Sequence, residues 1–376
     1  DIPSPANTLH AYLGLSTIAR ATITSMDLSA VRAAPGVVDV IVAADIPGHN
    51  DISPTGLNDE PVLADSEVAF WGQPLFAVIA KTRDQARRAA QLAKVAYDGL
   101  PHVCDVGEAM EKGYPHVTKP LTLERGDIAS AMAAAPHRIK GEMRVGGQDH
   151  FYLEGHIALA IPGENGAVQV FSSTQHPSEV QHMVAHVLGK NSHDVTITVR
   201  RMGGGFGGKE TQSNLFAAVA AVAARCGFSA DLSGPVTDRA LFHADNAYFY
   251  PAVRLVSRPM KTDTVSNTAF RGFGGPQGVI AAERIIEEIA YHRGMDTLAV
   301  RRANLYADGR DITPYHQTVA DNIMPQLLDQ IEKSSDYQAR RAAVLAHNAR
   351  GTTLRKGIAL TPVKFGISFT LTHLNQ

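Results

Sequence analysis

Two glycine-rich segments constrain the fold of this chain more than any other feature. RMGGGFGG (201–208) follows DVTITVRR, whose alternating Val195, Ile197 and Val199 predict a half-buried strand, and it precedes the alanine-rich helix SNLFAAVAAVAAR. RGFGGPQG (271–278) precedes the helix VIAAERIIEEIA. Both segments contain Gly-Phe-Gly-Gly, a match too short to indicate an internal repeat. Each is predicted to be a loop at the N-terminus of a helix.

Glycine-rich loops at helix N-termini favour bound anions. Glycine adopts positive φ without steric cost and lets backbone N–H groups approach a ligand, while the helix end adds unpaired donors and partial positive charge. The first segment lacks a nucleotide-binding pattern, because Gly208-Lys209 is followed by Glu210 and no GxGxxG stands in a clear βαβ unit. The functional prediction is a phosphate-bearing cofactor other than ATP or NAD, and the structural alternative is a pair of tight turns.

Charged residues lie beside both segments. Glu210 follows the first segment, Arg271 begins the second, and Arg239 lies in PVTDRALFHAD. A carboxylate and a guanidinium orient a polar heterocycle through directional hydrogen bonds, and a Phe ring stacks on it. The residues alone favour the alternative, in which Glu210 begins a helix and the arginines form surface ion pairs.

The first hundred residues predict an α+β unit. LHAYLGLS, VVDVIVAADI and WGQPLFAVIA are typical of strands, and DLSAVRAAPG predicts a short helix between the first two. Two capping boxes predict where later helices begin. Thr82 and Gln85 begin a helix through TRDQARRAAQLAKV, and Ser178 and Gln181 begin one in HPSEVQHMVAHVLG, which Gly189 ends.

Residues 98–137 lack strong periodicity and are the best candidate for a connection between domains. Beyond them, GGQDHFYLE (146–154) alternates Phe151 and Leu153 with other residues, which predicts a mainly structural core strand. VFSSTQ predicts another strand.

Composition excludes several functional classes. The chain has 376 residues, 44% of them hydrophobic, which is enough for two or more soluble domains. A net charge of -2 argues against nucleic acid and anionic membranes as partners, and no apolar run approaches the roughly 20 residues of a membrane span.

The start, DIPSPANTLH, lacks a basic and then apolar leader, so we expect a cytoplasmic protein. Cys104 and Cys226 have no CxxC partner, which argues against an iron–sulfur cluster or a structural zinc site built by this chain alone.

Six motifs follow one another in a recognisable order. They are GGQDHFYLE, FSSTQHPSE, RRMGGGFGGKE, DRALFHAD, SNTAFRGFGGPQG and TPVKFGISFTLTHLNQ. This succession resembles the molybdopterin-binding part of xanthine dehydrogenases, which are molybdenum hydroxylases. The resemblance implies an α+β fold, with a hammerhead-like α/β domain over 1–110, a connection over 111–137, and the N-terminal part of a molybdopterin-binding domain over 138–376.

The resemblance also implies the residues of a cofactor site. Gln175, in STQHP, matches the glutamine whose amide hydrogen-bonds an oxo ligand of molybdenum. Phe206 and Arg271 match residues placed beside the molybdenum without ligating it. Gly205 and Gly207 belong to the cofactor-binding loop. Each of these five residues is predicted to contact the molybdenum cofactor.

A purine site is implied in the same way. Glu210 and Arg239 match the pair that holds a purine substrate and assists catalysis, and Phe273 matches the ring that stacks on it. A fixed arginine in a dry pocket stabilises the negative charge that the heterocycle gains in the transition state. We expect Arg239 to have that role, with Glu210 and Phe273 fixing the tautomer and the plane of the ring.

The activity implied by the resemblance is hydroxylation of hypoxanthine or xanthine to urate with oxygen derived from water. The electrons would pass to iron–sulfur clusters and FAD on a partner subunit, with NAD as the final acceptor, in a hetero-oligomer. One alternative is an aldehyde oxidase-like molybdenum hydroxylase, which tends to replace the Glu and Arg of the purine pair. The other is a non-catalytic fragment that binds a partner subunit or cofactor.

The sequence departs from the family pattern in two places. The glutamate expected as general base lies in a further half of the family sequence, beyond THLNQ, so we expect the chain alone to be inactive. Relatives also have several tens of residues where Arg225 meets Cys226, and we predict an omission at that junction.

Overall fold

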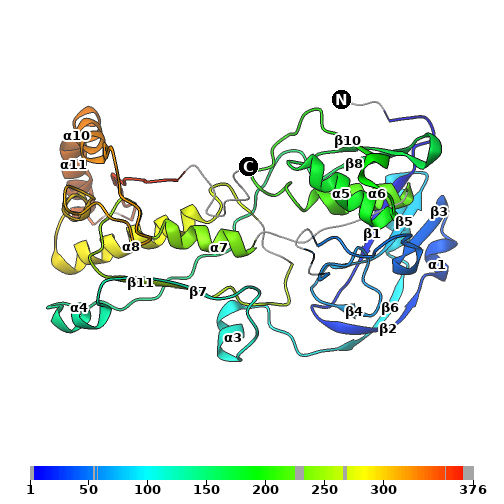
Figure 1. Cartoon of the computed structure of the whole chain (residues 1–376), viewed down its shortest axis with the longest axis horizontal. Helices are drawn as coiled ribbons and strands as arrows, with labels where there is room; N and C mark the ends of the chain where they lie inside the picture. Colours follow the sequence, from blue (N-terminus) through cyan, green and yellow to red (C-terminus); the bar gives the residue numbers. More distant parts are fainter. Residues whose placement is uncertain are drawn as a thin grey trace. The chain divides into compact units, whose positions relative to one another are not determined.

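The computed structural model describes residues 4–53, 56, 58–224, 233–265, 269–351 and 353–366. The chain divides into two compact units (Figure 1). The first unit comprises residues 1–117, 148–233 and 260–271, and the second comprises 118–147, 234–259 and 272–376. The junction at 225–226 lies outside the described residues.

The described part of the first unit contains three sheets. Their strand orders are β1-β5-β3 and β4-β2-β6, both antiparallel, and β10-β9-β8, in which β10 is parallel and β8 antiparallel to β9. Its strands and helices are β1 (His10–Leu15), β2 (Ala21–Asp27), α1 (Ser29–Arg32), β3 (Val37–Val42), η1 (Ala43–Asp45), β4 (Glu67–Val68), β5 (Pro74–Ala80), α2 (Arg83–Ala90), β6 (Lys94–Gly99), α3 (Val106–Glu111), β8 (Ala158–Pro162), η2 (Glu164–Gly166), β9 (Val168–Ser172), α5 (Pro177–Leu188), η3 (Ser192–Asp194), β10 (Val195–Thr198) and α6 (Ser213–Ala223).

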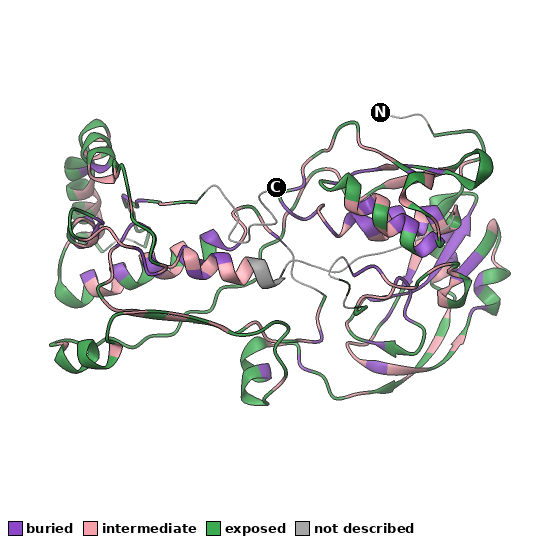
Figure 2. Ribbon diagram, viewed as in Figure 1, coloured by how far each residue is buried: buried purple, intermediate pink, exposed green. Residues whose placement is uncertain are grey.

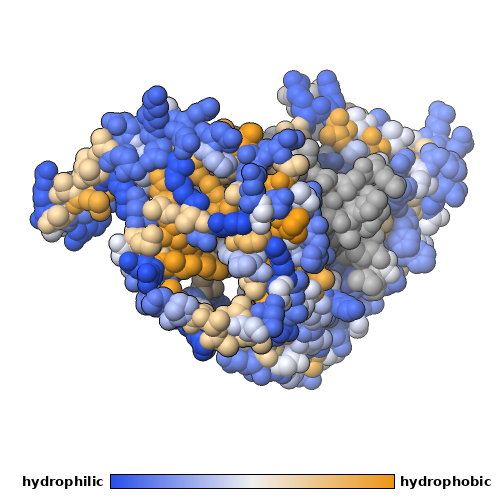
Figure 3. All heavy atoms as spheres, turned by 60° about the vertical axis from the view of Figure 1, so that its left-hand side comes forward, coloured by the Kyte–Doolittle hydropathy of each residue, from blue (hydrophilic) through white to orange (hydrophobic). Residues whose placement is uncertain are grey.

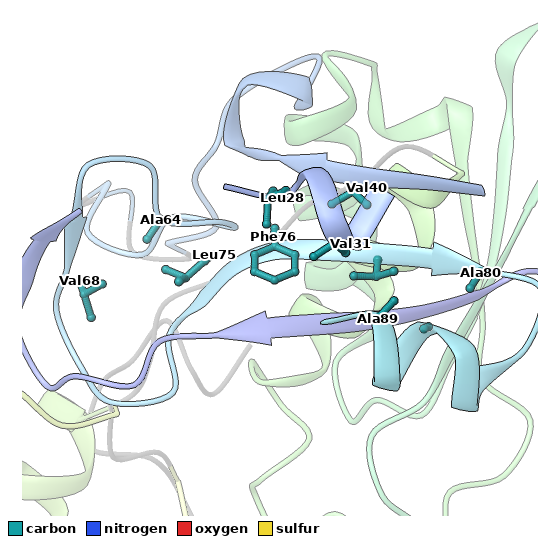
Figure 4. Packing of buried hydrophobic residues seen from close by; sticks show 11 residues of the cluster. Leu28, Val31, Val40, Ala64, Val68, Leu75, Phe76, Ala80 and Ala89 are labelled. Carbon is teal, nitrogen blue, oxygen red and sulfur yellow. The ribbon is translucent and has the colours of Figure 1, made fainter. Parts of the chain in front are cut away.

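Strand β5 is the centre of the first unit, because all seven of its residues are buried. Phe76 and Val78 belong to the core that faces α1 and α2 (Figure 4). Ala77 and Ile79 belong to a second core, which includes residues of α5 and α6. A strand covered on both faces reads as a continuous apolar run, which is why PLFAVIA predicted it correctly.

The predicted helix after Thr82 begins where expected and ends early. Thr82 caps α2 by accepting a hydrogen bond from the Gln85 N–H at 3.2 Å, but the Gln85 side chain accepts from the Thr82 hydroxyl and does not complete the capping box. The helix ends at Ala90, and residues from Lys94 onward form β6. The apolar spacing past Ala90 belongs to this strand, which pairs with β2.

The capping box predicted at Ser178 and Gln181 was wrong. Helix α5 begins two residues earlier than this box implies, at Pro177, whose fixed φ suits the first helical position. The Gln181 side chain donates instead to the carbonyl oxygens of Ser192 and Val195, at 3.0 and 2.8 Å. The predicted stop at Gly189 was right, because this residue ends α5 with φ +61°.

The second unit is built around helices. In its described part it contains the antiparallel ribbon of β7 (Leu121–Arg125) and β11 (Val253–Ser257), and the helices α4 (Ile128–Ala134), α7 (Ser233–Phe242), α8 (Gly275–Arg293), α9 (Thr297–Asn304), α10 (Met324–Ser334) and α11 (Tyr337–Ala349). Figure 2 shows buried positions along α8 and an α4 without any. The fully buried Arg301 pairs with Glu283 at 2.8 Å and Glu287 at 3.3 Å, so a charged network crosses this core.

Helices α7 and α8 pack closely because two glycines lie where they meet. A Cβ on Gly278 would lie 2.3 Å from the Ala240 oxygen, and one on Gly274 would lie 2.0 Å from the Val236 oxygen. Glycine is therefore required at both positions. The contact holds the start of α8 against the helix that carries Arg239. None of the described helices has the length and apolarity needed to cross a bilayer.

Candidate functional site

The first glycine loop, defined here as residues 203–209, contains a strained turn. The Gly208 N–H donates to the Gly205 oxygen at 2.8 Å, and the two central residues, Phe206 and Gly207, have φ values of +52° and +94°. This combination is typical of a type I′ turn. Phe has no intrinsic preference for positive φ, so the surrounding contacts must impose it, a form of strain that is common at functional sites.

The second glycine loop, residues 272–275, repeats this turn. The Gly275 N–H donates to the Gly272 oxygen at 2.9 Å, and Phe273 and Gly274 have φ values of +51° and +97°. The shared Gly-Phe-Gly-Gly sequence therefore marks a shared backbone conformation. Tight turns, the structural alternative for these segments, are present in both.

Gln175 lies against the first glycine loop. Its Oε1 accepts hydrogen bonds from the N–H groups of Gly207 at 2.9 Å and Lys209 at 3.3 Å. Two N–H donors require an acceptor, so the orientation of the amide is fixed and Nε2 faces away from them. A Cβ on Gly205 would lie 2.3 Å from Oε1, which explains a glycine there. Within the described residues, Nε2 forms no hydrogen bond.

The first glycine loop also presents backbone donors. The N–H groups of Gly204, Gly205 and Phe206 donate no hydrogen bond to any described residue. The Phe206 side chain is 44% exposed. Together with Gln175 Nε2, these groups can bind the acceptor oxygens of a ligand.

The core strand predicted over 146–154 was wrong. This segment has no regular secondary structure, and Phe151 and Leu153 are 86% and 100% exposed. The side chains do alternate, but the polar ones lie inside, because His150, Tyr152 and Glu154 lie against the loop. These three side chains are the nearest neighbours that a Cβ would meet on Gly208, Gly204 and Gly203, respectively.

Glu154 and Lys209 form a charged pair beneath the first glycine loop. Lys209 is fully buried, and its Nζ lies 2.9 Å from Glu154 Oε2, 2.7 Å from Ser173 Oγ and 4.7 Å from the centre of the Tyr152 ring. Hydrogen bonds from Ser173, the Gly203 N–H and Lys209 lower the pKa of Glu154 to about 2. Neither residue was among the predicted site residues. A lysine inside a glycine-rich loop was the available signal.

Glu210 follows the loop and does not begin a helix, since α6 starts at Ser213. It is half-buried, and its N–H donates to the Gly207 oxygen at 3.4 Å. A hydrogen bond to Glu179, at 3.1 Å, raises the pKa of His176, and the charge of Glu210 adds to this effect. Glu210 therefore contributes negative charge next to the loop.

Arg239 is buried in the second unit, with only 5% of its surface exposed. Its guanidinium lies 4.8 Å from the centre of the Phe365 ring and donates to the Gly366 oxygen, and burial lowers its pKa. Because the second glycine loop packs on α7, the structure brings Arg239 and Phe273 to neighbouring elements. A surface ion pair does not describe this arginine.

The predicted residues fall in both units. Gln175, Gly205, Phe206, Gly207, Glu210 and the exposed Arg271 lie in the first unit, and Arg239 and Phe273 lie in the second. The pairing of Glu210 with Arg239 across a substrate stays a prediction. Among the described residues, no three His, Cys, Asp or Glu side chains gather in a way that would hold a metal ion.

Comparison with known proteins identifies the family. Residues 1–101 match the aldehyde oxidase and xanthine dehydrogenase a/b hammerhead domain, and residues 110–226 and 224–305 match the molybdopterin cofactor-binding domain. The chain belongs to the aldehyde oxidase and xanthine dehydrogenase family of molybdenum hydroxylases. The predicted fold, a hammerhead domain followed by a molybdopterin-binding domain, is confirmed, as is membership of an oxidoreductase family.

Relatives in this family are longer than the chain. The xanthine dehydrogenase/oxidase of Mus musculus is 38% identical over 427 positions, which cover all of this chain and 32% of the mouse protein. That of Gallus gallus is also 38% identical, over all of the chain and 31% of its own length. The chain thus spans about a third of these curated relatives.

Solved structures agree on the fold. The aldehyde oxidoreductase of Desulfovibrio gigas matches with a TM-score of 0.80 and 26% identity, over 91% of this chain and 44% of its own. Quinoline 2-oxidoreductase from Pseudomonas putida matches with a TM-score of 0.80 and 22% identity, over 93% of this chain and 53% of its own. The second likeness concerns the fold alone.

Proposed function

We propose that this chain is the N-terminal part of a cytoplasmic molybdenum-cofactor-binding subunit that hydroxylates hypoxanthine and xanthine to urate. The observation that carries the proposal is the fixed amide of Gln175, which offers Nε2 as a donor. It lies beside a loop in which the N–H groups of Gly204, Gly205 and Phe206 donate to no described residue. Such a donor set suits the oxygen ligands and phosphate of the molybdopterin cofactor.

The described residues fit this cofactor. Gln175 Nε2 would donate to an oxygen ligand of molybdenum, and the N–H groups of Gly205 and Phe206 would bind other acceptors of the cofactor. Phe206 and Arg271 are both exposed and would line the same site. When bound, the cofactor supplies the two-electron chemistry that inserts water-derived oxygen. This chain contributes binding and orientation.

A purine would be held by Glu210, Arg239 and Phe273. The buried guanidinium of Arg239 has a fixed place between the Phe365 ring and the Gly366 oxygen, so it needs little reorganisation to stabilise negative charge on the heterocycle. Glu210 would accept a ring N–H, and Phe273 would stack on the ring. The general base would come from the part of the relatives' length that this chain does not span.

Steady-state kinetics of Glu210→Ala and Arg239→Met in the full-length holoenzyme tests the proposal. We expect kcat/KM for xanthine to fall at least about 100-fold in each, because each loses a group that acts on the transition state. Arg254→Met is the matched control, since Arg254 is exposed and, among the described residues, pairs only with Glu124, at 2.6 Å, within the same unit. Xanthine turnover unchanged by both site variants would overturn the proposed substrate.

An aldehyde oxidase-like activity is the second candidate, and the likeness to the Desulfovibrio gigas aldehyde oxidoreductase favours it. The two activities differ in what Glu210 and Arg239 would do. An aldehyde offers no heterocyclic N–H groups to Glu210 and gains no ring charge for Arg239. If the same variants leave aldehyde turnover unchanged and it exceeds xanthine turnover in the unaltered enzyme, the aldehyde assignment is the correct one.

We further propose that iron–sulfur clusters and FAD on a partner subunit accept the electrons and pass them to NAD. Apolar side chains gather on the face in Figure 3, a property typical of interaction surfaces, which supports a hetero-oligomer. Analysis of flavin, iron and subunit stoichiometry in the purified complex would test this, and a complex without flavin or iron would contradict it.

A further inference from the structure

One carboxylate oxygen joins the two ends of the first glycine loop. Glu154 Oε2 accepts hydrogen bonds from the Gly203 N–H at 2.9 Å and from Lys209 Nζ at 2.9 Å. The same atom accepts from Ser173 Oγ at 2.5 Å, just after the end of β9. Glu154 therefore fixes the length that the loop spans and ties it to a strand.

Lys209 carries this constraint to Gln175. Its side chain is fully buried and bound by Glu154, while its backbone contacts Gln175 twice. The Lys209 oxygen accepts from the Gln175 N–H at 2.7 Å, and the Lys209 N–H donates to Gln175 Oε1 at 3.3 Å. A continuous set of contacts thus runs from a charged pair to the amide whose Nε2 remains available.

We propose that Glu154 and Lys209 are positioning residues that hold the Gln175 amide in the orientation needed to donate to the cofactor. This inference rests on the proposed function, because it assigns a ligand to Nε2. Lys209 is fully buried, so removing the Glu154 carboxylate leaves its charge without compensation. The first glycine loop then shifts. The N–H groups of Gly207 and Lys209, which donate to Oε1 and so fix the amide, move away from Gln175.

A purely structural role makes a different prediction from a positioning role. If Glu154 only stabilises the fold, its replacement lowers kcat by the same factor whether or not Gln175 is also replaced. If it acts through Gln175, its loss changes nothing further once the amide is gone. Glu154→Gln, Gln175→Ala and the double variant separate the two roles.

The kinetic test uses the full-length holoenzyme. We expect Glu154→Gln to lower kcat about tenfold with KM changed less than about twofold, because orientation matters in the transition state. The double variant should be no slower than Gln175→Ala. The electron paramagnetic resonance signal of molybdenum should shift similarly in all three. Multiplicative losses in kcat, or an unchanged signal in Glu154→Gln, would overturn the inference.

Hydrogen exchange in the cofactor-free protein provides a readout that needs no activity. Amides in a peptide covering 201–212 should exchange faster in Glu154→Gln than in the unaltered protein, because Gly203, Gly207 and Lys209 lose protection. The control is Asp263→Asn, which alters a buried carboxylate that accepts from the Val103 N–H at 2.8 Å, away from the loop. Equal exchange in all three proteins would overturn the positioning role.

The two proposals fail differently. A folded, full-length protein that binds no molybdenum would refute the proposed function, and with it the ligand assigned to Nε2. A molybdenum-containing enzyme in which Gln175→Ala impairs turnover but Glu154→Gln does not would refute the positioning role alone.

Discussion

Gly207 has a φ of +94°, and a Cβ there would lie 2.3 Å from the Ala269 oxygen. Gly207→Ala should therefore destabilise the protein by at least about 2 kcal/mol, through backbone strain and a clash with a rigid carbonyl. Urea denaturation measures this. Gly155→Ala is the control, because a Cβ added there would meet no described atom within 4 Å and the φ of Gly155 is not positive. This substitution should change the free energy of unfolding little. Equal losses in both variants would contradict the assigned turn.

His156 makes stability depend on pH. Its Nε2 lies 2.6 Å from the Tyr152 hydroxyl, its ring stacks on Phe216, and burial lowers its pKa to about 4. The unfolded state binds more protons between about pH 6.5 and pH 4, so the free energy of unfolding should fall as pH falls through that window.

His156→Gln should weaken this dependence, which denaturation at pH 7 and pH 5 would measure. His193→Gln, at a side chain that is 80% exposed, is the control and should behave like the unaltered protein. A His156 variant that loses as much stability between the two pH values as the unaltered protein would show that His156 does not cause the dependence.

For single residues, the sequence points to those that stand in a recognisable motif. It misses those whose role depends on a partner far away in the chain. Gln175 and Phe206 stand in motifs, and the structure places Gln175 against the loop that contains Phe206, while their roles stay predictions. Glu154 was missed because it receives its role from Gly203 and Lys209, about fifty residues later in the chain. No local pattern encodes that contact.

Helices α7 and α8 make the element-scale contact that places Arg239. Gly278→Ala would put a Cβ 2.3 Å from the Ala240 oxygen, one residue from Arg239. We expect a loss of about 1–3 kcal/mol in the free energy of unfolding, as for other overpacked contacts, together with a higher KM for xanthine. Gly357→Ala is the control, because a Cβ added there would meet no described atom within 4 Å. Unchanged stability and KM would contradict the helix contact.

Elements were predictable where one local signal dominates. The continuous apolar run of β5 and the glycine that ends α5 are examples. Prediction failed where two arrangements share a pattern. The alternation of 146–154 has the period of a strand, but its polar face packs on glycines, which have no side chains to reveal the contact. The period of a segment cannot decide which of its faces is inside.

At the scale of the whole molecule, the omission near 225–226 stays a prediction. The cofactor-binding domain matches in two segments that meet at 224–226, and the mouse relative aligns over 427 positions with a chain of 376 residues. We predict that the native polypeptide lacks the chymotryptic peptide 217–228, because we expect a further segment between Arg225 and Cys226. Detection of that peptide by mass spectrometry would contradict the prediction.

The molybdenum content of the full-length protein tests the proposed cofactor site most directly. Protein from a host that makes molybdopterin should contain stoichiometric molybdenum. Gly205→Val should remain folded by circular dichroism and lose the metal, because its side chain needs the space of Gln175 Oε1, 2.3 Å away. A folded, full-length protein without molybdenum, or a Gly205→Val variant that retains all of it, would contradict the assignment of the first glycine loop and Gln175 as the cofactor site.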